Sequence, residues 1–346
     1  MTWNRDWAQA AKNIFEALRI KKSDRLAIIY NEEPKGKEFL VKALSALAGK
    51  TDTPVITPTV VLDKSFDISS IEPKLYKFFE GTKNTERKFF FSASRFSFRP
   101  ARGAVHKLIS VDPAKLNGFT ISLPTSNPDI IHNLALTSPN KLYSRGEALR
   151  KILTNATGIR ITSPKGTDIS FDWDKNKRKY LISAGFPDTN EDHWDNLGGE
   201  VYTAPIHETV NGRLIIDGAI GNLGLVDGVV AVDIIKGRAT LNRKASTASK
   251  KLLDDFNAEL TMFPCASVVG EFGIGTTPNL KLVGELVNDE KVEGTIHIAF
   301  GDSYSANGSG GENDCDAHTD CMVLSPTVEM TVNGKIITLM KDGKFS

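Results

Sequence analysis

Apolar and polar positions repeat with a helical period and a strand period in turn over the first part of the chain. Helical patterns cover residues 5–20, 35–50 and 144–156, and apolar strand-like runs cover 25–30, 54–62, 89–94 and 118–124. The order strand, helix, strand at this spacing is typical of a parallel βαβ unit. The pattern therefore predicts an α/β domain over residues 1–160.

The pattern changes near residue 157. Residues 157–174 form two short alternating runs about a Pro-Lys-Gly-Thr turn, which is typical of a β-hairpin. Further strand-like runs follow, with an Asn-Gly turn at 333–334 and one amphipathic helical stretch at 247–262. We therefore expect a second domain over residues 161–346, a β-rich α+β domain.

Composition excludes several classes of protein. The 43 basic residues balance 42 acidic ones, so the formal charge of +1 does not favour nucleic acid as a partner. The first twenty residues carry charges throughout and lack the apolar core of a signal peptide or membrane span. We expect a cytoplasmic protein that does not bind membranes. Its three cysteines are too few for a disulfide framework, which fits a reducing compartment.

Candidate chemistry is densest in HIAFGDSYSANGSGGENDCDAHTD, residues 297–320. His318 and Asp320 are two positions apart, so on an extended segment both side chains leave the same face. His297 lies in a strand-like run and faces away from its apolar neighbours. An imidazole and a carboxylate that converge are suited to a divalent cation. Gly-Asp-Ser at 301–303 resembles the nucleophile block of SGNH hydrolases, but it lies too close to the end of the chain for that fold.

Two glycine-flanked segments upstream add carboxylates. NLGGEVYTAP (196–205) and GEFGIGTTPN (270–279) each place one glutamate, Glu200 or Glu271, beside glycine at the edge of a strand-like run. Glycine lets the backbone pass close to a site, and carboxylates can bridge paired metal ions. No Gly-Lys-Ser/Thr follows the second segment, so a phosphate-binding loop is excluded.

The blocks GGEVYTAP, GEFGIGTTPN, DEKVEGTIHIAFGDSY and AHTD resemble, in order and spacing, the M29 metallo-aminopeptidases of the aminopeptidase T or PepS type. The resemblance implies an aminopeptidase that cleaves short peptides or small amides with water activated by two divalent ions, Zn, Co or Mn. It also implies a homodimer. The residues it places around the metal centre are Glu200, Glu271, His297, Tyr304, His318 and Asp320. Glu200, Glu271 and Tyr304 are also catalytic in this interpretation, with one glutamate bridging the ions and the other accepting a proton.

A second enzyme class fits much of the same set. The 2,5-dihydroxypyridine dioxygenases resemble M29 peptidases and bind one Fe(II). Two histidines and one carboxylate, such as His297, His318 and Asp320, form the facial triad of such iron enzymes. Glutamates at both 200 and 271 favour two metals and the peptidase. A third hypothesis is a binding protein that keeps the fold without turnover.

Overall fold

The computed structural model describes residues 6–22, 24–30, 37–57, 72–79, 88–93, 118–123, 125, 127–185, 194–305 and 308–346. The chain forms two compact units. The first contains residues 1–141 and 184–198, and the second contains 142–183 and 199–346. The units interleave along the sequence, whereas the apolar pattern predicts one boundary near residue 160.

A parallel five-stranded sheet forms the centre of the first unit, in the order β2-β1-β3-β4-β8. Its strands are β1 (Arg25–Tyr30), β2 (Val55–Ile56), β3 (Lys88–Ala93), β4 (Gly118–Ser122) and β8 (Trp194–Asn196). Its helices are α1 (Trp7–Leu18), α2 (Lys37–Lys50), α3 (Glu72–Phe79) and α5 (Pro128–Leu136). The predicted parallel βαβ arrangement is confirmed for these strands.

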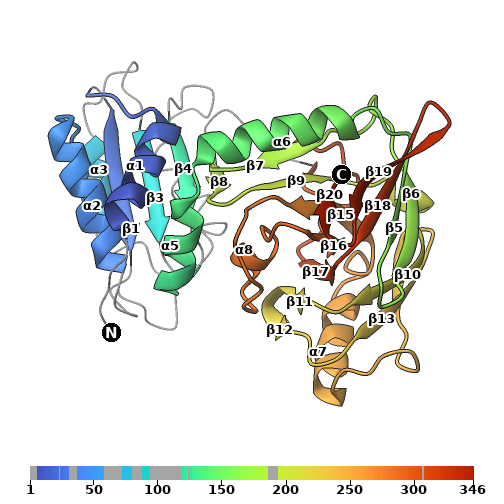
Figure 1. The fold of residues 1–346 in the computed structure, drawn as a ribbon. Coiled ribbons are helices and arrows are strands. Elements are labelled where there is room, and N and C mark those ends of the chain that lie inside the picture. The colour runs from blue at the N-terminus through green and yellow to red at the C-terminus, as the bar shows by residue number, and fades with distance from the viewer. Residues whose placement is uncertain are drawn as a thin grey trace. The chain divides into compact units, whose positions relative to one another are not determined.

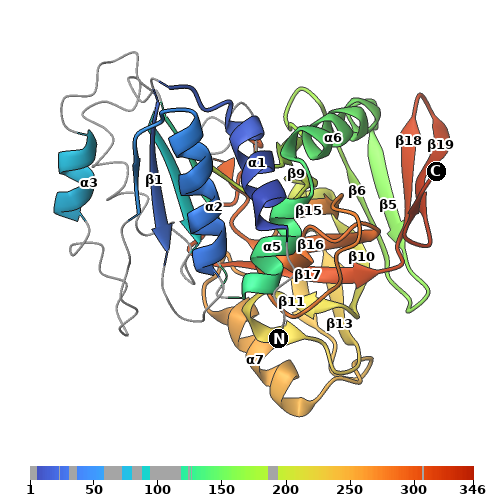
Figure 2. The same ribbon diagram turned by 60° about the vertical axis from the view of Figure 1, so that its left-hand side comes forward.

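Helices α1, α2 and α5 pack against one another, and Figure 2 shows them side by side to the right of β1. Helix α1 begins where the Asp6 side chain accepts a hydrogen bond of 2.8 Å from the Gln9 backbone N–H, the usual N-cap contact. Its residues Ala11, Ile14 and Leu18 are buried, as the helical spacing of apolar residues predicts.

The second unit contains two antiparallel sheets (Figure 1). One has the order β14-β13-β10-β6-β5-β18-β19-β20 and the other β12-β11-β17-β16-β15-β9-β7. The strands of the first are β5 (Gly158–Thr162), β6 (Asp168–Asp172), β10 (Asn211–Ile216), β13 (Val230–Ile235), β14 (Arg238–Leu241), β18 (Thr327–Val332), β19 (Lys335–Lys341) and β20 (Lys344–Phe345). Those of the second are β7 (Leu181–Ser183), β9 (Glu200–Thr203), β11 (Ala219–Ile220), β12 (Gly224–Leu225), β15 (Val269–Gly275), β16 (Thr295–Gly301) and β17 (His318–Leu324). Helices α7 (Lys250–Thr261) and α8 (Leu286–Asp289) and most of α6 (Pro139–Leu153) complete the unit.

The core of the second unit lies between these sheets. Phe171 of β6 meets Phe272 of β15 edge to face, with ring centroids 5.4 Å apart. Phe300 of β16 contacts Phe256 of α7 at 6.3 Å between centroids. Phe272 and Phe300 face this core. Because side chains alternate along a strand, the residues next to them in β15 and β16 face the other way. That opposite face carries the candidate site.

The structure corrects one expectation about the cysteines. Cys265 and Cys315, 50 residues apart in sequence, form a disulfide, while Cys321 is free and buried in β17. Spacing alone does not predict such a pairing. Among the described residues, none of the helices combines the length and the apolar character that a membrane crossing requires.

Candidate metal centre

Strand register places five of the six predicted site residues on one face of the second unit's seven-stranded sheet. In adjacent strands, Glu200 is paired with Gly275, Glu271 with Ala299, and Asp320 also with Ala299. His318 pairs with Gly301, and His297 with Gly273. Because side chains alternate along a strand, these pairings gather side chains from four neighbouring strands into one cluster. The strands are β9, β15, β16 and β17. Glu200, Glu271, His297 and Asp320 are buried and His318 is partly buried.

A glycine opposite His297 makes room for its imidazole. A Cβ at Gly273 would lie 2.0 Å from His297 Nε2 and 2.2 Å from Cε1. Any side chain at 273 would therefore displace the ring. The glycines that the sequence pattern places beside Glu271 thus serve close packing within the sheet.

Carboxylate oxygens from three strands surround His297 Nε2. Glu271 Oε1 lies at 3.1 Å, Glu200 Oε2 at 3.6 Å and Asp320 Oδ1 at 3.9 Å. Like charges gathered in a buried site are costly unless a cation lies among them. The geometry is that of a cation-binding site.

His318 presents a lone pair to the same cluster. Its Nδ1 donates a hydrogen bond of 2.8 Å to the backbone carbonyl of Asp302, because a carbonyl can only accept. When the ring is neutral, Nε2 is therefore the acceptor, and when the ring is protonated, Nε2 carries a proton; it lies 3.4 Å from Asp320 Oδ1 and 3.7 Å from Glu271 Oε2. An imidazole held by its other nitrogen, with its lone pair facing carboxylates, is the usual arrangement of a metal ligand.

The charges of the cluster shift its pKa values. Burial lowers the pKa of His297, but its hydrogen bond with Glu271 and the charges of Asp320, Glu200 and Glu271 outweigh burial and raise that pKa to about 9. Burial raises the pKa of Glu271. Burial also acts to raise the pKa of Asp320, yet the neighbouring charge of protonated His318 brings it down to about 2. In the absence of a metal, an imidazolium therefore takes the place of a bound cation.

Two three-residue groups in this cluster have the ligand types and spacing of a metal site: Glu200, Glu271 and His297, and Glu271, His318 and Asp320. Within each group the ligand atoms lie within 4.8 Å of one another. Glu200 Oε2, Glu271 Oε2, His297 Nδ1 and Asp320 Oδ1 are buried and make no hydrogen bond within the described part of the chain. Buried polar atoms normally have partners, so the three orphaned oxygens fit a metal ion. Glu271 belongs to both groups.

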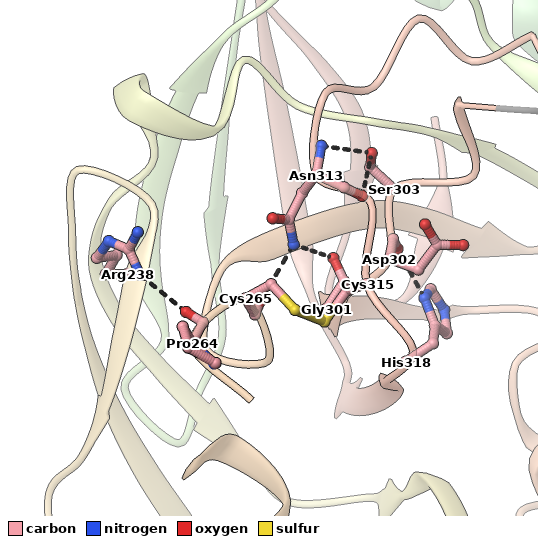
Figure 3. Close-up of a disulfide and its surroundings, with 9 residues drawn as sticks. All are labelled: Arg238, Pro264, Cys265, Gly301, Asp302, Ser303, Asn313, Cys315 and His318. Atoms are coloured by element: carbon pink, nitrogen blue, oxygen red, sulfur yellow. Dashed lines mark hydrogen bonds between the residues drawn. A yellow bond between two sulfur atoms is a disulfide. The ribbon is translucent and has the colours of Figure 1, made fainter. Parts of the chain in front are cut away.

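Tyr304, the sixth predicted site residue, lies beside the cluster. Its ring is 4.4 Å from that of His318, measured between centroids. It lies in the segment between β16 and β17, which also includes Cys315. Figure 3 shows Asn313 donating hydrogen bonds to the carbonyls of Gly301, at 2.6 Å, and Cys265, at 3.1 Å, next to the disulfide. These contacts tie the segment to the end of β16 and to the turn that precedes β15.

Sequence reasoning missed two charged residues at the site, Glu290 and Lys291. Lys291 is completely buried and forms an ion pair with Glu200 and another, of 2.9 Å, with Glu290. Burial raises the pKa of Glu290 to about 7, although the charge of Lys291 acts to lower it. Both lie in the block DEKVEGTIHIAFGDSY that carries the resemblance, but charged residues in a turn are ordinarily exposed, so no local signal marked them.

Comparisons with known proteins identify the family and the fold of the chain. Residues 140–345 match the family described as thermophilic metalloprotease (M29). The structure of 2,5-dihydroxypyridine dioxygenase from Pseudomonas putida KT2440 is similar over 98% of this chain and 96% of that chain, with a TM-score of 0.70 and 13% identity. Wild-type AmpT from Thermus thermophilus is similar over 97% and 98%, with a TM-score of 0.63 and 16% identity. At such identities these two likenesses establish the fold alone. No curated protein matches the chain.

Proposed function

Because the chain belongs to the M29 family of thermophilic metalloproteases, we propose that it is a metal-dependent aminopeptidase that releases N-terminal residues from short peptides or small amides. The supporting observation is the convergence of Glu200, Glu271, His297, His318 and Asp320 on one buried point. Carboxylate and imidazole ligands of this kind suit Zn, Co or Mn. We propose that the residues of this cluster hold the tightly bound metal ion.

A divalent ion held there would supply Lewis-acid chemistry, polarising a scissile carbonyl and making water nucleophilic near neutral pH. Glu271 is the ligand common to both groups, with Oε1 3.1 Å from His297 Nε2 and Oε2 3.7 Å from His318 Nε2. In the two-ion arrangement predicted from the sequence, Glu271 would therefore hold both ions and Glu200 would be a ligand of the second ion. With one ion, Glu200 Oε2 is left to accept the proton of the attacking water.

The remaining residues have proposed roles in binding and orientation. Asp302 holds the His318 ring through its backbone carbonyl, so that Nε2 faces the metal position. Tyr304, whose ring lies against His318, donates a hydrogen bond to the oxygen that gains charge in the transition state. The free α-amine of a substrate is recognised by the carboxylates of the cluster, which selects N-terminal residues.

A dioxygenase of the 2,5-dihydroxypyridine type is the second candidate. Asp320 Oδ1 lies 3.9 Å from His297 Nε2 and 3.4 Å from His318 Nε2, so these three residues have the composition of a facial triad for Fe(II). The solved dioxygenase also has the higher TM-score of the two similar structures, 0.70 against 0.63. Against it stands Glu271, a further carboxylate in the same ligand group as His318 and Asp320. A carboxylate-rich site favours hydrolysis.

Turnover on one sample separates the two candidates. Protein purified without chelators is analysed for metal content and assayed with aminoacyl p-nitroanilides, with their N-acetylated forms as controls. The same sample is given 2,5-dihydroxypyridine while oxygen uptake is recorded. We expect cleavage of the free-amine anilides alone, loss of activity with a chelator and recovery with Zn, Co or Mn. Oxygen uptake supported by Fe(II), without amide cleavage, would establish the dioxygenase. Metal binding without either reaction would favour a binding protein.

Assembly and location are further proposals from the family resemblance. We propose a homodimer in the cytoplasm, with neither nucleic acid nor membrane as a partner, in line with the near-zero net charge. Sedimentation of the metal-loaded protein tests the dimer. A monomer at assay concentration would contradict it.

A further inference from the structure

The buried side chain of Lys291 places a positive charge next to Glu200, one of the residues of the metal centre. The side chain is completely buried, although lysine is almost never buried unless its charge is paired. Its Nζ contacts Glu200 Oε1, Glu290 Oε1 at 2.9 Å and Ser183 Oγ at 3.2 Å. An ammonium group has three N–H donors, and each of these acceptors can receive one of them. They come from β9, the end of α8 and β7, which fixes the group in place.

The ion pair with Lys291 gives the two carboxylate oxygens of Glu200 different surroundings. Oε1 is bound to Lys291, while Oε2 lies 3.6 Å from His297 Nε2. Glu271 differs, because each of its oxygens faces a histidine, Oε1 at 3.1 Å from His297 and Oε2 at 3.7 Å from His318. The group of Glu200, Glu271 and His297 thus shares one carboxylate with a buried cation.

A second divalent ion at that group would lie next to the ammonium. Both charges would be buried, where like charges repel much more strongly than in water. The ion pairs of Lys291 are with Glu200 and Glu290, and neither Glu290 nor Glu200 belongs to the group of Glu271, His318 and Asp320. The charge of Lys291 also acts to lower the pKa of Asp320, but less than the charges of His318 and His297 do. The two groups are therefore unequal in their electrostatics.

We propose that Lys291 is a positioning residue that makes the centre hold one ion tightly, at Glu271, His318 and Asp320, and keeps Glu200 from binding a second ion with comparable affinity. Lys291 thereby reserves Glu200 Oε2 for proton transfer. The inference rests on the metal centre of the proposed function, but it concerns the number of ions and not the reaction catalysed.

Metal titration tests this directly. Protein freed of metal with a chelator is titrated with Zn²⁺ and with Mn²⁺, and bound metal is measured by equilibrium dialysis with elemental analysis. We expect one tightly bound ion per chain and a second that binds at least about tenfold more weakly, as repulsion by a buried charge requires. Two ions of equal affinity in the unchanged protein would overturn the proposal.

Variants separate the role of Lys291 from a general effect on the fold. In Lys291→Met, which has similar length and no charge, the second ion should bind at least about tenfold more tightly. In Arg145→Met, which removes a cation paired with Glu293 instead, the stoichiometry should stay that of the unchanged protein. A Lys291→Met protein that folds and still binds one ion would overturn the inference.

Glutamate variants give an answer even if Lys291→Met does not fold. Glu200→Gln should keep the tight ion, whereas Glu271→Gln should lose it. Loss of the tight ion in Glu200→Gln would make Glu200 a ligand of the tight position and overturn the proposal. Because these are binding measurements, unequal ions without anilide cleavage would leave the inference standing while the proposed function fails. Anilide cleavage by a protein that binds two ions with equal affinity would support the proposed function and overturn the inference.

Discussion

Gly273 and His297 are cross-strand partners in which the glycine backbone forms the floor under the imidazole, so that a Cβ at 273 would lie 2.0 Å from Nε2. No L side chain fits there unless the ring moves. The position of His297 among Glu200, Glu271 and Asp320 therefore depends on a residue that has no side chain to contribute to the site.

Gly273→Ala is expected to damage the centre by displacing His297. Overpacking of this kind costs about 1–3 kcal/mol of unfolding free energy, and the displaced imidazole should weaken metal binding as well. Urea unfolding and metal titration measure the two effects. The matched control is Gly49→Ala in α2, where a Cβ would meet nothing within 4 Å. Equal behaviour of the two variants would contradict the packing argument.

Glu271→Gln is expected to abolish tight metal binding and to reduce kcat/KM at least about 100-fold, because this carboxylate belongs to both ligand groups. The amide has nearly the same shape but no charge. Glu329→Gln in β18, outside both groups, is the control and should behave as the unchanged protein. Retention of both metal and activity in Glu271→Gln would remove Glu271 from the centre.

Tyr304→Phe separates two roles for the tyrosine. If the hydroxyl stabilises the transition state, its removal lowers kcat about 100- to 1,000-fold with metal content unchanged. If Tyr304 is a metal ligand, as the family resemblance implies, metal affinity falls as well. The packing of its ring against His318, 4.4 Å between centroids, favours the first outcome, because phenylalanine keeps that contact.

The geometry of the His-x-Asp pair was predictable from sequence because alternation along a strand is a local property. His318 and Asp320 indeed share one face of β17, and His297 points away from Ile296 and Ile298. Most described helices and strands were predictable for the same reason, since the period of the apolar positions distinguishes a helix from a strand.

Non-local features were not predictable in this way. Residues 194–196 add the strand β8 to the parallel sheet of the first unit, far along the chain from β4. Lys291 meets Glu200 across 91 positions, and Cys265 meets Cys315 across 50. Each contact joins segments that are distant in sequence, and the local period of apolar residues does not reveal which segments meet. The glutamates were assigned by resemblance to a family, since a single Glu beside glycine has no specific meaning.

Metal removal should make stability depend on pH through His297. Its pKa, about 9 in the metal-free centre, lies above the ordinary value of 6.5. A folded-state pKa that is raised contributes stability that is complete below about pH 6.5 and is lost as pH rises through about 9. Urea unfolding of chelated protein between pH 6 and about 9.5 should show this decline.

Metal affinity should change in the opposite sense over the same range. A divalent ion bound in the cluster lies close to His297 and favours its neutral form, so binding releases a proton and strengthens up to about tenfold per pH unit below about 9. Calorimetry in two buffers of different ionisation enthalpy counts the protons. Metal-loaded protein is the control and should lack the decline in stability above pH 6.5. No proton release at pH 7.5 would contradict an imidazolium in the metal-free centre.

Reduction of the disulfide between Cys265 and Cys315 should loosen the segment that leads into His318. Asn313 already ties this segment to the carbonyls of Gly301 and Cys265, so the disulfide adds a covalent link to an existing hydrogen-bonded contact. A cross-link over 50 residues typically contributes about 2–4 kcal/mol, mainly by restricting the unfolded chain. Treatment with a phosphine reductant should lower the unfolding free energy by that amount and weaken metal binding at His318.

The double variant Cys265→Ser and Cys315→Ser provides the control, because it retains Cys321 and should not respond to the reductant. Counting thiols in the denatured protein tests the pairing itself. One reactive thiol per chain before reduction and three afterwards are expected from one disulfide and one free cysteine. Three thiols in protein purified under oxidising conditions would show that the pair stays reduced, in agreement with the compartment that the sequence predicts.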